Sequence, residues 1–167
     1  NTLVFLGLGT IDDFSVKAPD DFDSRQQATI EQVPIIQQKT TTIGLSWKRK
    51  FKNGKGSMIT SFSTNRLQNI FSRYKDNTKK SGVLFQNDSH EQETKLRFQT
   101  QHYLEQWKLA AGTNIQYSDY GNATQSVLYN LDYNTGIDFM KYGFFAKAEH
   151  KFLDDNLGLS FGFRVDA

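Results

Sequence analysis

Residues 107–117 run Trp-Lys-Leu-Ala-Ala-Gly-Thr-Asn-Ile-Gln-Tyr, and apolar side chains recur at every second position. Successive side chains of a β-strand point to opposite faces of the sheet. A period of two therefore predicts a strand with one apolar and one polar face. The apolar face carries Trp107, Leu109, Ala111, Thr113, Ile115 and Tyr117, and the other face carries Lys108, Ala110, Gly112, Asn114 and Gln116.

The same alternation recurs along the chain, while helical spacing is hard to find. Ile43, Leu45 and Trp47 share one face of their segment, and residues 157–165 repeat the pattern at the other end of the sequence. The alternation is less clean after Asn65. We predict an all-β antiparallel up-and-down meander of about seven strands, at residues 2–11, 41–51, 57–74, 90–104, 107–119, 136–152 and 157–167.

The predicted connections alternate strictly between short and long. Short turns fall at 52–56, 105–106 and 153–156, and the first contains the hairpin signal Asn53-Gly54. Long loops are expected at approximately 12–40, 75–89 and 120–135. A further strand at 28–37 is the alternative within the first of these, although Pro34 argues against a central strand there. Bacterial outer-membrane barrels show this asymmetry, with short periplasmic turns and long extracellular loops.

Aromatic residues gather near both ends of the predicted strands. Phe51, Trp107 and Phe152 lie beside the three short turns. Two aromatic belts around an apolar band are typical of a lipid-facing barrel wall. The alternative is that aromatic residues simply favour strands. The second predicted belt contains Tyr117, Tyr120, Tyr133, Phe139 and Tyr142.

The polar face of the strands is rich in cations. Either this face lines a wet lumen, or the apolar face forms the core of a soluble sheet, and periodicity does not separate these two arrangements. The cations in question are Lys48, Lys50, Lys95, Arg97, Lys108 and Lys147.

Composition excludes several classes of protein. The net charge of the 167-residue chain is +2, so it lacks the basic footprint of a nucleic-acid-binding protein. The absence of Cys excludes disulfides, thiolate metal sites and cysteine nucleophiles. Aromatic residues make up 14%, which is too many for a disordered chain. The chain contains no run of about 18 apolar residues, so no transmembrane helix is predicted. A membrane-spanning β-strand needs only about 9–11 residues.

Both ends of the chain fall inside predicted strands. A closed single-chain bacterial barrel has an even number of strands, and seven does not satisfy this. We therefore expect a single segment, residues 1–167, of a larger transmembrane β-barrel whose chain is longer.

Few residues suggest chemistry, and we predict no catalytic, cofactor-binding or metal-ligating residues. His90, His102 and His150 have no metal-ligand spacing, and the last two are expected in the barrel wall. A solvated loop is favoured over a Ca²⁺ site for the acidic cluster of Asp12, Asp13, Asp20, Asp21 and Asp23. A solvated turn is likewise favoured over a lipid or partner contact for the cluster of Lys48, Lys50, Lys52 and Lys55.

Four stretches resemble the barrel of TonB-dependent outer-membrane receptors of the Bacteroidetes type. They are Gln92–Phe98, Trp107–Gly112, residues 141–146 and residues 157–166, and the resemblance covers about residues 40–167. It implies a barrel of about 22 strands closed by a plug, located in the bacterial outer membrane. It implies import of a scarce nutrient, of siderophore, vitamin, glycan or peptide class, with no enzymatic activity and no cofactor.

The same resemblance implies the partners. They would be the remainder of the barrel and its plug, TonB acting through that plug, outer-membrane lipid and an extracellular ligand, with no nucleic acid. The plug and the TonB-contacting segment are not found in this sequence.

Two alternatives from other classes stay open. One is a soluble lipocalin-like β-barrel that binds a small apolar ligand, with Trp47 and Trp107 in its interior. The other is an outer-membrane barrel enzyme, in which His90 would be the only candidate base near the long loops.

Overall fold

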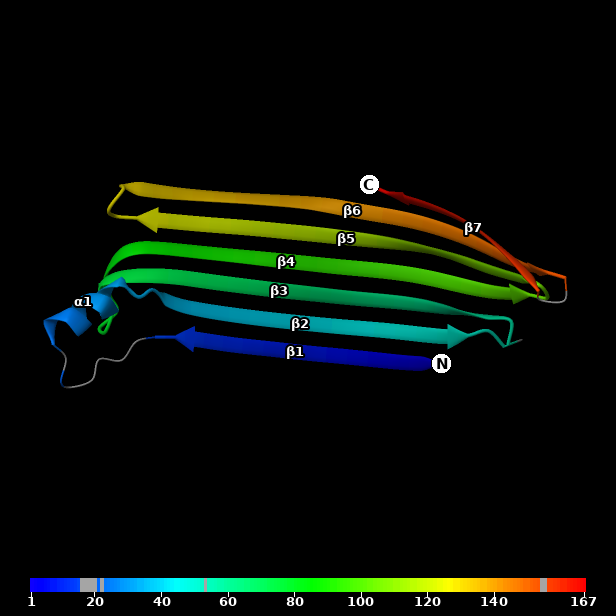
Figure 1. The fold of residues 1–167 in the computed structure, drawn as a ribbon, viewed down its shortest axis with the longest axis horizontal. Coiled ribbons are helices and arrows are strands. Elements are labelled where there is room, and N and C mark those ends of the chain that lie inside the picture. Colours follow the sequence, from blue (N-terminus) through cyan, green and yellow to red (C-terminus); the bar gives the residue numbers. More distant parts are fainter. Residues whose placement is uncertain (16–20, 22, 53, 154–155) are drawn as a thin grey trace.

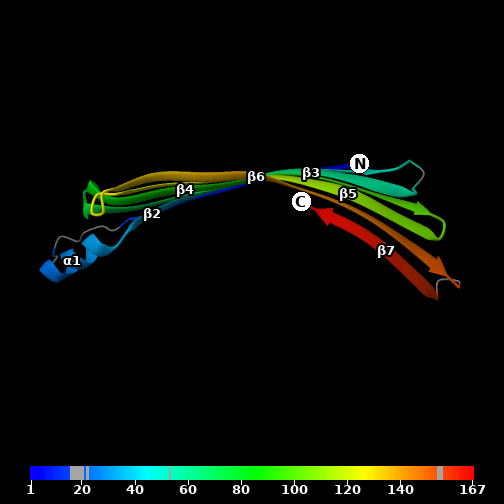
Figure 2. The same ribbon diagram turned by 90° about the horizontal axis from the view of Figure 1, so that it is seen from above.

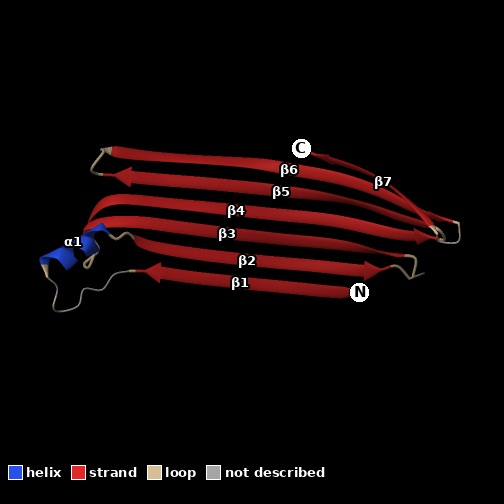
Figure 3. Ribbon diagram, in the orientation of Figure 1, coloured by secondary structure: helices blue, strands red, loops and turns tan. Residues whose placement is uncertain are grey.

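The computed structural model describes residues 1–15, 21, 23–52, 54–153 and 156–167. Seven strands and one helix make up this part of the chain, and the helix lies at one end of the sheet (Figure 3). The elements are β1 (Thr2–Phe14), α1 (Ser24–Gln32), β2 (Ile35–Lys50), β3 (Gly56–Asp76), β4 (Ser81–Leu104), β5 (Trp107–Ser126), β6 (Leu131–Phe152) and β7 (Leu157–Asp166).

The strands form one open antiparallel sheet in sequence order, from β1 to β7 (Figure 1). Each strand pairs with the strand that follows it in the chain, which confirms the predicted seven-stranded meander. Seen from above, the sheet is a single twisted and curved layer (Figure 2). The strand order leaves β1 and β7 at opposite edges.

The register places the alternating apolar positions of β2 to β7 on one face, whereas β1 has apolar side chains on both faces, with Val4 and Leu6 opposite Ser46 and Gly44. Leu3 pairs with Trp47, which pairs with Thr60, and the same row continues through Phe98 and Thr113. Directly paired residues of antiparallel strands lie on the same face of a sheet. The predicted alternation therefore extends from β2 to β7, and we call the two sides of the sheet the apolar face and the polar face.

Two of the three predicted long loops are wrong, because strands extend through them. Residues 75–89 are expected as a loop, but β4 begins at Ser81 and its ladder with β3 reaches the pair Asp76–Ser81. Residues 120–135 are mostly strand as well, and the ladder of β5 and β6 ends only at Ser126–Leu131. Beyond about Tyr117 both faces of the sheet are partly polar, so the period of two fades although the backbone pairing continues.

The third long connection is shorter than predicted and contains a helix. β1 extends to Phe14 and β2 begins at Ile35, directly after Pro34, so no strand covers residues 28–34. Asp23 caps the N-terminus of α1, because its Oδ1 accepts hydrogen bonds from the backbone N–H groups of Arg25 (2.9 Å) and Gln26 (2.8 Å). The Gln26 side chain accepts in return from the Asp23 N–H, which completes a capping box. Among the described helices, none is long and apolar enough to cross a membrane.

The short turns lie where the sequence predicts them. Glu105 and Gln106 alone connect β4 to β5, and Glu105 has a positive φ of 50°. In the first turn Gly54 has a φ of 69°, which favours glycine, and its N–H donates to Phe51 O. Asn53, Asp154 and Asp155 lie outside the described residues.

Asn77 holds α1 against the turn between β3 and β4. Its side chain is buried, and Nδ2 donates to the carbonyl oxygens of Ile30 and Val33, both at 2.7 Å. Its Oδ1 accepts from the backbone N–H of Tyr74 at 3.0 Å. We call these three hydrogen bonds of Asn77 the clamp. Ile30 and Ile35 are the only buried apolar side chains of the described residues, so the small core lies beside the clamp.

A polar turn completes the same end of the sheet. The Thr78 hydroxyl and the Lys79 backbone N–H donate to Asp76 Oδ1 at 2.7 and 3.0 Å. The Thr78 hydrogen bond and that of the Lys79 backbone hold the pKa of the Asp76 carboxyl below its usual value.

Candidate functional site: the two faces of the sheet

The apolar face forms a band of limited height. On β5 the band runs from Trp107 to Tyr117, which is roughly 33 Å at about 3.3 Å per residue. A strand tilted by about 40° would then span roughly 25 Å, the height of the apolar band of outer-membrane barrels. Within the band Arg49, near the short turns, is the only charged side chain on this face among the described residues.

Aromatic and histidine rings form a girdle at the short-turn end of this band. The Phe51 ring stacks on His102, with the ring centroids 4.8 Å apart. The His150 ring lies between Trp107 and Phe152, at centroid distances of 4.3 and 4.0 Å. Phe51, Trp107 and Phe152 thus lie together as the first predicted belt, and both histidines lie on the apolar face with them.

The second predicted belt is wrong for three of its five members. Tyr117 and Tyr142 lie on the apolar face. Tyr142 pairs directly with Ile115 of that face, and Tyr117 is two residues after Ile115 on the same strand. Tyr120 and Phe139 lie on the polar face, where their rings stack at a centroid distance of 5.9 Å. Tyr133 shares the parity of Phe139 and lies there too. The far edge of the apolar band is therefore marked by two tyrosines rather than five aromatic rings.

Above the band, the same face of the sheet becomes polar. β4 continues for another 13 residues beyond Thr94, which is roughly 43 Å of strand. The side chains that replace the apolar ones on this part of the face are Arg66, Gln68, Asp88, His90, Gln92, Asp119 and Asp138.

The polar face carries all six cations that the sequence places there. Strand pairing puts Lys48 and Arg97 on it, opposite Thr2 and Asn114 respectively. Several are paired with carboxylates: Lys108 Nζ lies 3.3 Å from Glu149 Oε2, and Lys147 also contacts Glu149. At the edge strand, Arg164 and Asp166 form a two-point ion pair with distances of 2.6 and 3.0 Å.

A connected polar network crosses β4 and β5 at the top of the band. Glu93 accepts from Lys95 Nζ at 2.6 Å, from Gln116 Nε2 at 3.0 Å and from Tyr120 Oη at 3.3 Å. Gln116 also donates to the hydroxyl of Ser118, which is fully buried. These hydrogen bonds hold the Glu93 carboxylate on the polar face, and its negative charge is paired with Lys95.

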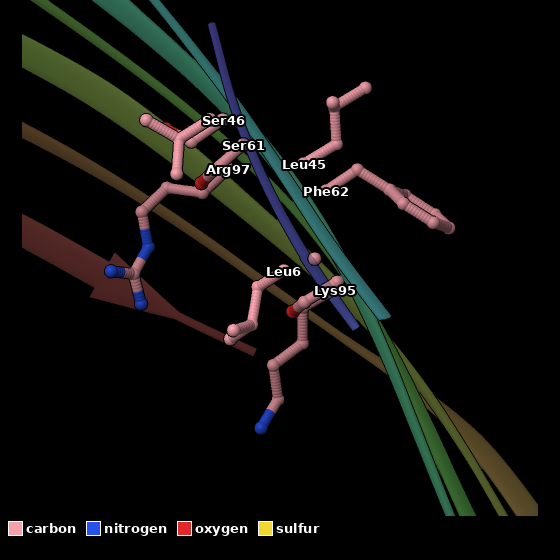
Figure 4. Close-up of a pocket in the computed structure, with 10 residues that line it drawn as sticks. Leu6, Leu45, Ser46, Ser61, Phe62, Lys95 and Arg97 are labelled. Carbon is pink, nitrogen blue, oxygen red and sulfur yellow. The ribbon is translucent and has the colours of Figure 1, made fainter. Parts of the chain in front are cut away.

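An open hollow of about 350 Å³ lies below this network. In the close-up, Leu6, Lys95 and Arg97 leave the sheet on one side, and Leu45 and Phe62 on the other (Figure 4). The hollow is floored by the small residues Gly44, Ser46, Ser61 and Ser63 of β2 and β3.

His90 pairs with Asp119, and among the residues that the structure describes no hydroxyl is seen to hydrogen-bond to His90. His90 Nε2 lies 3.4 Å from Asp119 Oδ2, and its ring covers Gly121, where a Cβ would come within 2.2 Å of it. The nearest hydroxyls in the sequence, Ser89 and Ser118, are one residue away along each strand and so lie on the opposite face.

The acidic cluster does not converge. Asp12 and Asp13 are adjacent in β1, so their side chains leave the sheet on opposite sides, and Asp13 accepts from Gln37 Nε2. Asp23 caps α1, Asp21 lies in a turn, and Asp20 is outside the described residues. In the part of the chain that is described, no group of three His, Cys, Asp or Glu could hold a metal ion.

Neither a protein-family model nor a curated protein sequence matches the chain. Among solved structures, it is similar to the ferric preacinetobactin receptor BauA from Acinetobacter baumannii, with a TM-score of 0.51 and 9% identity. The match covers 80% of this chain and 25% of the receptor, so the chain spans about a quarter of the length of that protein.

The structural match shows the fold: an open seven-stranded meander that resembles part of a TonB-dependent receptor barrel. The similarity is to a receptor rather than to an enzyme. An open sheet also encloses no interior, so the lipocalin-like closed barrel does not describe this structure.

Proposed function

We propose that this chain is a segment of the barrel wall of a TonB-dependent outer-membrane receptor that imports a scarce nutrient. The observation that carries the proposal is the apolar band, roughly 25 Å high, on one face of a sheet whose other face is charged. Lipid would cover the apolar face, and the polar face would line the lumen. The similarity to part of a receptor barrel supports the same assignment.

The remaining partners follow from this proposal. The edges β1 and β7 would pair with further strands of the same barrel, because an exposed edge strand offers unpaired backbone groups. The barrel would hold a plug that responds to TonB, and the extracellular ligand would reach it from the end where α1 and the β3–β4 turn lie. The siderophore, vitamin, and glycan or peptide classes of nutrient are all compatible with this wall.

Cell fractionation tests the proposal. An antibody against residues 81–90 should detect, in the outer-membrane fraction of native cells, a band several times larger than the 19.2 kDa of this chain. A soluble protein near 19.2 kDa would refute the proposal, because its apolar face would then be covered within a soluble assembly.

A further inference from the structure

The polar face has an excess of positive charge that the whole chain does not have. The net charge of the chain is +2, yet nine cations and three carboxylates lie on this face between the short turns and Glu93, among the described residues. The cations are Lys48, Lys50, Lys95, Arg97, Lys108, Lys141, Lys147, Lys151 and Arg164. The carboxylates are Glu93, Glu149 and Asp166.

All three carboxylates are already engaged by neighbouring cations. Glu93 is held by Lys95, Glu149 by Lys108 and Lys147, and Asp166 by Arg164. Arg97 lies two residues from Lys95 on the same strand. Unlike Lys95, which pairs with Glu93, Arg97 has no ion pair or hydrogen bond to any described residue. Its guanidinium is therefore available to an anion from outside this sheet.

Arg97 lines the open hollow on this face, together with Lys95 and the apolar strand β1 (Figure 4). Val4 and Leu6 form the opposite side of the hollow, and they are 55% and 50% exposed. Between them lie serines of β2 and β3, with Ser61 directly paired to Arg97. The hollow thus offers a cation at one side, an apolar surface at the other and hydroxyl groups between.

We propose that this hollow is a ligand subsite that takes an anionic group joined to a small apolar portion. Arg97 would bind the anion, since a planar guanidinium matches the geometry of carboxylate and phosphate oxygens. Val4 and Leu6 would contact the apolar portion. The volume of about 350 Å³ is at the lower end of the range for ligand pockets, roughly 300–1,000 Å³, which suits a small molecule or one part of a larger one.

This inference rests on the proposed function, because the hollow lies on the ligand path only if the polar face lines the lumen. It then narrows the class of imported nutrient to anionic compounds. The excess of cations on the same face would raise the local concentration of such anions along the wall.

Cysteine modification of the receptor in isolated outer membranes tests the inference. Residues 1–167 contain no Cys, so Ser61→Cys introduces one thiol into this segment, opposite Arg97, and the receptor without this substitution gives the background reaction. The probes are the anionic reagent methanethiosulfonate ethylsulfonate and its cationic trimethylammonium analogue. We expect the anionic reagent to be favoured at this thiol relative to a free thiol, and Arg97→Gln to lower that preference roughly three- to tenfold.

Two controls separate the inference from the proposed function. Thr60→Cys places the thiol on the apolar face, where lipid should prevent reaction with both reagents. Lys50→Gln removes another cation from the polar face, at the short-turn end of β2, and should change the preference at residue 61 much less than Arg97→Gln.

The outcomes are distinguishable. If Thr60→Cys reacts and Ser61→Cys does not, the faces are reversed and the proposed function fails. If Thr60→Cys is protected but Ser61→Cys shows no dependence on Arg97, the wall assignment holds and the anion subsite is refuted. If Ser61→Cys and Thr60→Cys are both unreactive, protein fills the hollow, which also refutes a ligand subsite.

Discussion

Asn77 illustrates how one residue can hold an element that packing alone would not hold. Its amide group satisfies two carbonyl oxygens at the end of α1 and one N–H of β3. Outside this clamp, α1 makes few contacts with the sheet, and its buried apolar residue is Ile30. The order of the segment before Pro34 therefore depends on hydrogen bonds of a single buried side chain.

Asn77→Ala should release α1 without unfolding the sheet. The substitution removes the Asn77 hydrogen bonds to Ile30 O and Val33 O, which costs about 1–3 kcal/mol, so local opening should increase by roughly 5–150-fold. Trypsin cleavage after Arg25 should accelerate by a factor in that range in the receptor in outer membranes. Asn77→Asp keeps the acceptor but loses the donor, and should behave similarly.

Asn87→Ala is the matched control for this prediction. Asn87 also donates two side-chain hydrogen bonds, to Asn122 and Thr124, but these join β4 to β5 and involve no residue of α1. Cleavage after Arg25 should stay at the wild-type rate in this variant. Equal cleavage rates in Asn77→Ala and in the wild type would show that the clamp does not hold α1.

Such single-residue roles are largely beyond prediction from sequence. The carbonyl partners of Asn77 are 44 and 47 residues away from it, so no local pattern reveals them. The cap of α1 is different, because Asp23 followed by Gln26 is a local capping signal. The alternation alone predicts the face on which Arg97 lies, whereas its lack of an ion-pair or hydrogen-bond partner among the described residues is visible only in the structure.

At the level of single strands, β5 has one part that the sequence predicts as a strand and another part that it does not. From Trp107 to Tyr117 one face is apolar and the other polar, and this contrast predicts both the strand and its orientation. From Ser118 to Ser126 no such contrast exists, although hydrogen bonding to β4 and β6 continues. Hydrophobic periodicity therefore reports where a strand meets two different environments, and not where the strand ends.

Adjacent alanines on β5 allow a matched test of the two environments. Ala111 lies on the apolar face near the middle of the band, and Ala110 lies on the polar face. Ala111→Arg should destabilise the folded barrel by about 2–4 kcal/mol, the cost of a cation facing lipid near the bilayer midplane. Ala110→Arg should cost less than about 1 kcal/mol, because its charge faces water.

The urea midpoint of the receptor, followed by tryptophan fluorescence in lipid vesicles, measures both variants of this pair. The substitution is the same at both positions, so differences in side-chain size and strand propensity largely cancel. Similar midpoints for the two variants would mean that the apolar face does not contact lipid.

The molecule as a whole has far more surface than a compact protein of its size. Its accessible surface is 12196 Å², whereas a compact monomer of 19.2 kDa has roughly 8,400 Å². Many large apolar side chains contribute to it: Phe161 and Ile11, for example, are each 77% exposed. A stable form in the cell therefore requires lipid or other protein to cover this surface.

The arrangement of the whole sheet was predictable because the alternation of apolar and polar residues recurs from strand to strand. Successive alternating segments with short turns at one end predict an up-and-down meander, and one register error would place apolar residues on the wrong face. The length of the sheet beyond the band was not predictable, since polar residues occupy loops and extended strands alike.

Spin-label scanning along β5 tests the central claim most directly. Single cysteines at successive positions from Lys108 to Gln125 would be labelled in the receptor in membranes, and collision rates with oxygen and with an aqueous nickel chelate measured by electron paramagnetic resonance. We predict alternation up to Tyr117, with odd positions accessible to oxygen and even positions to nickel, and nickel access on both faces from residue 119 onward. Odd positions shielded from both reagents would contradict the account, because they would then form a protein core.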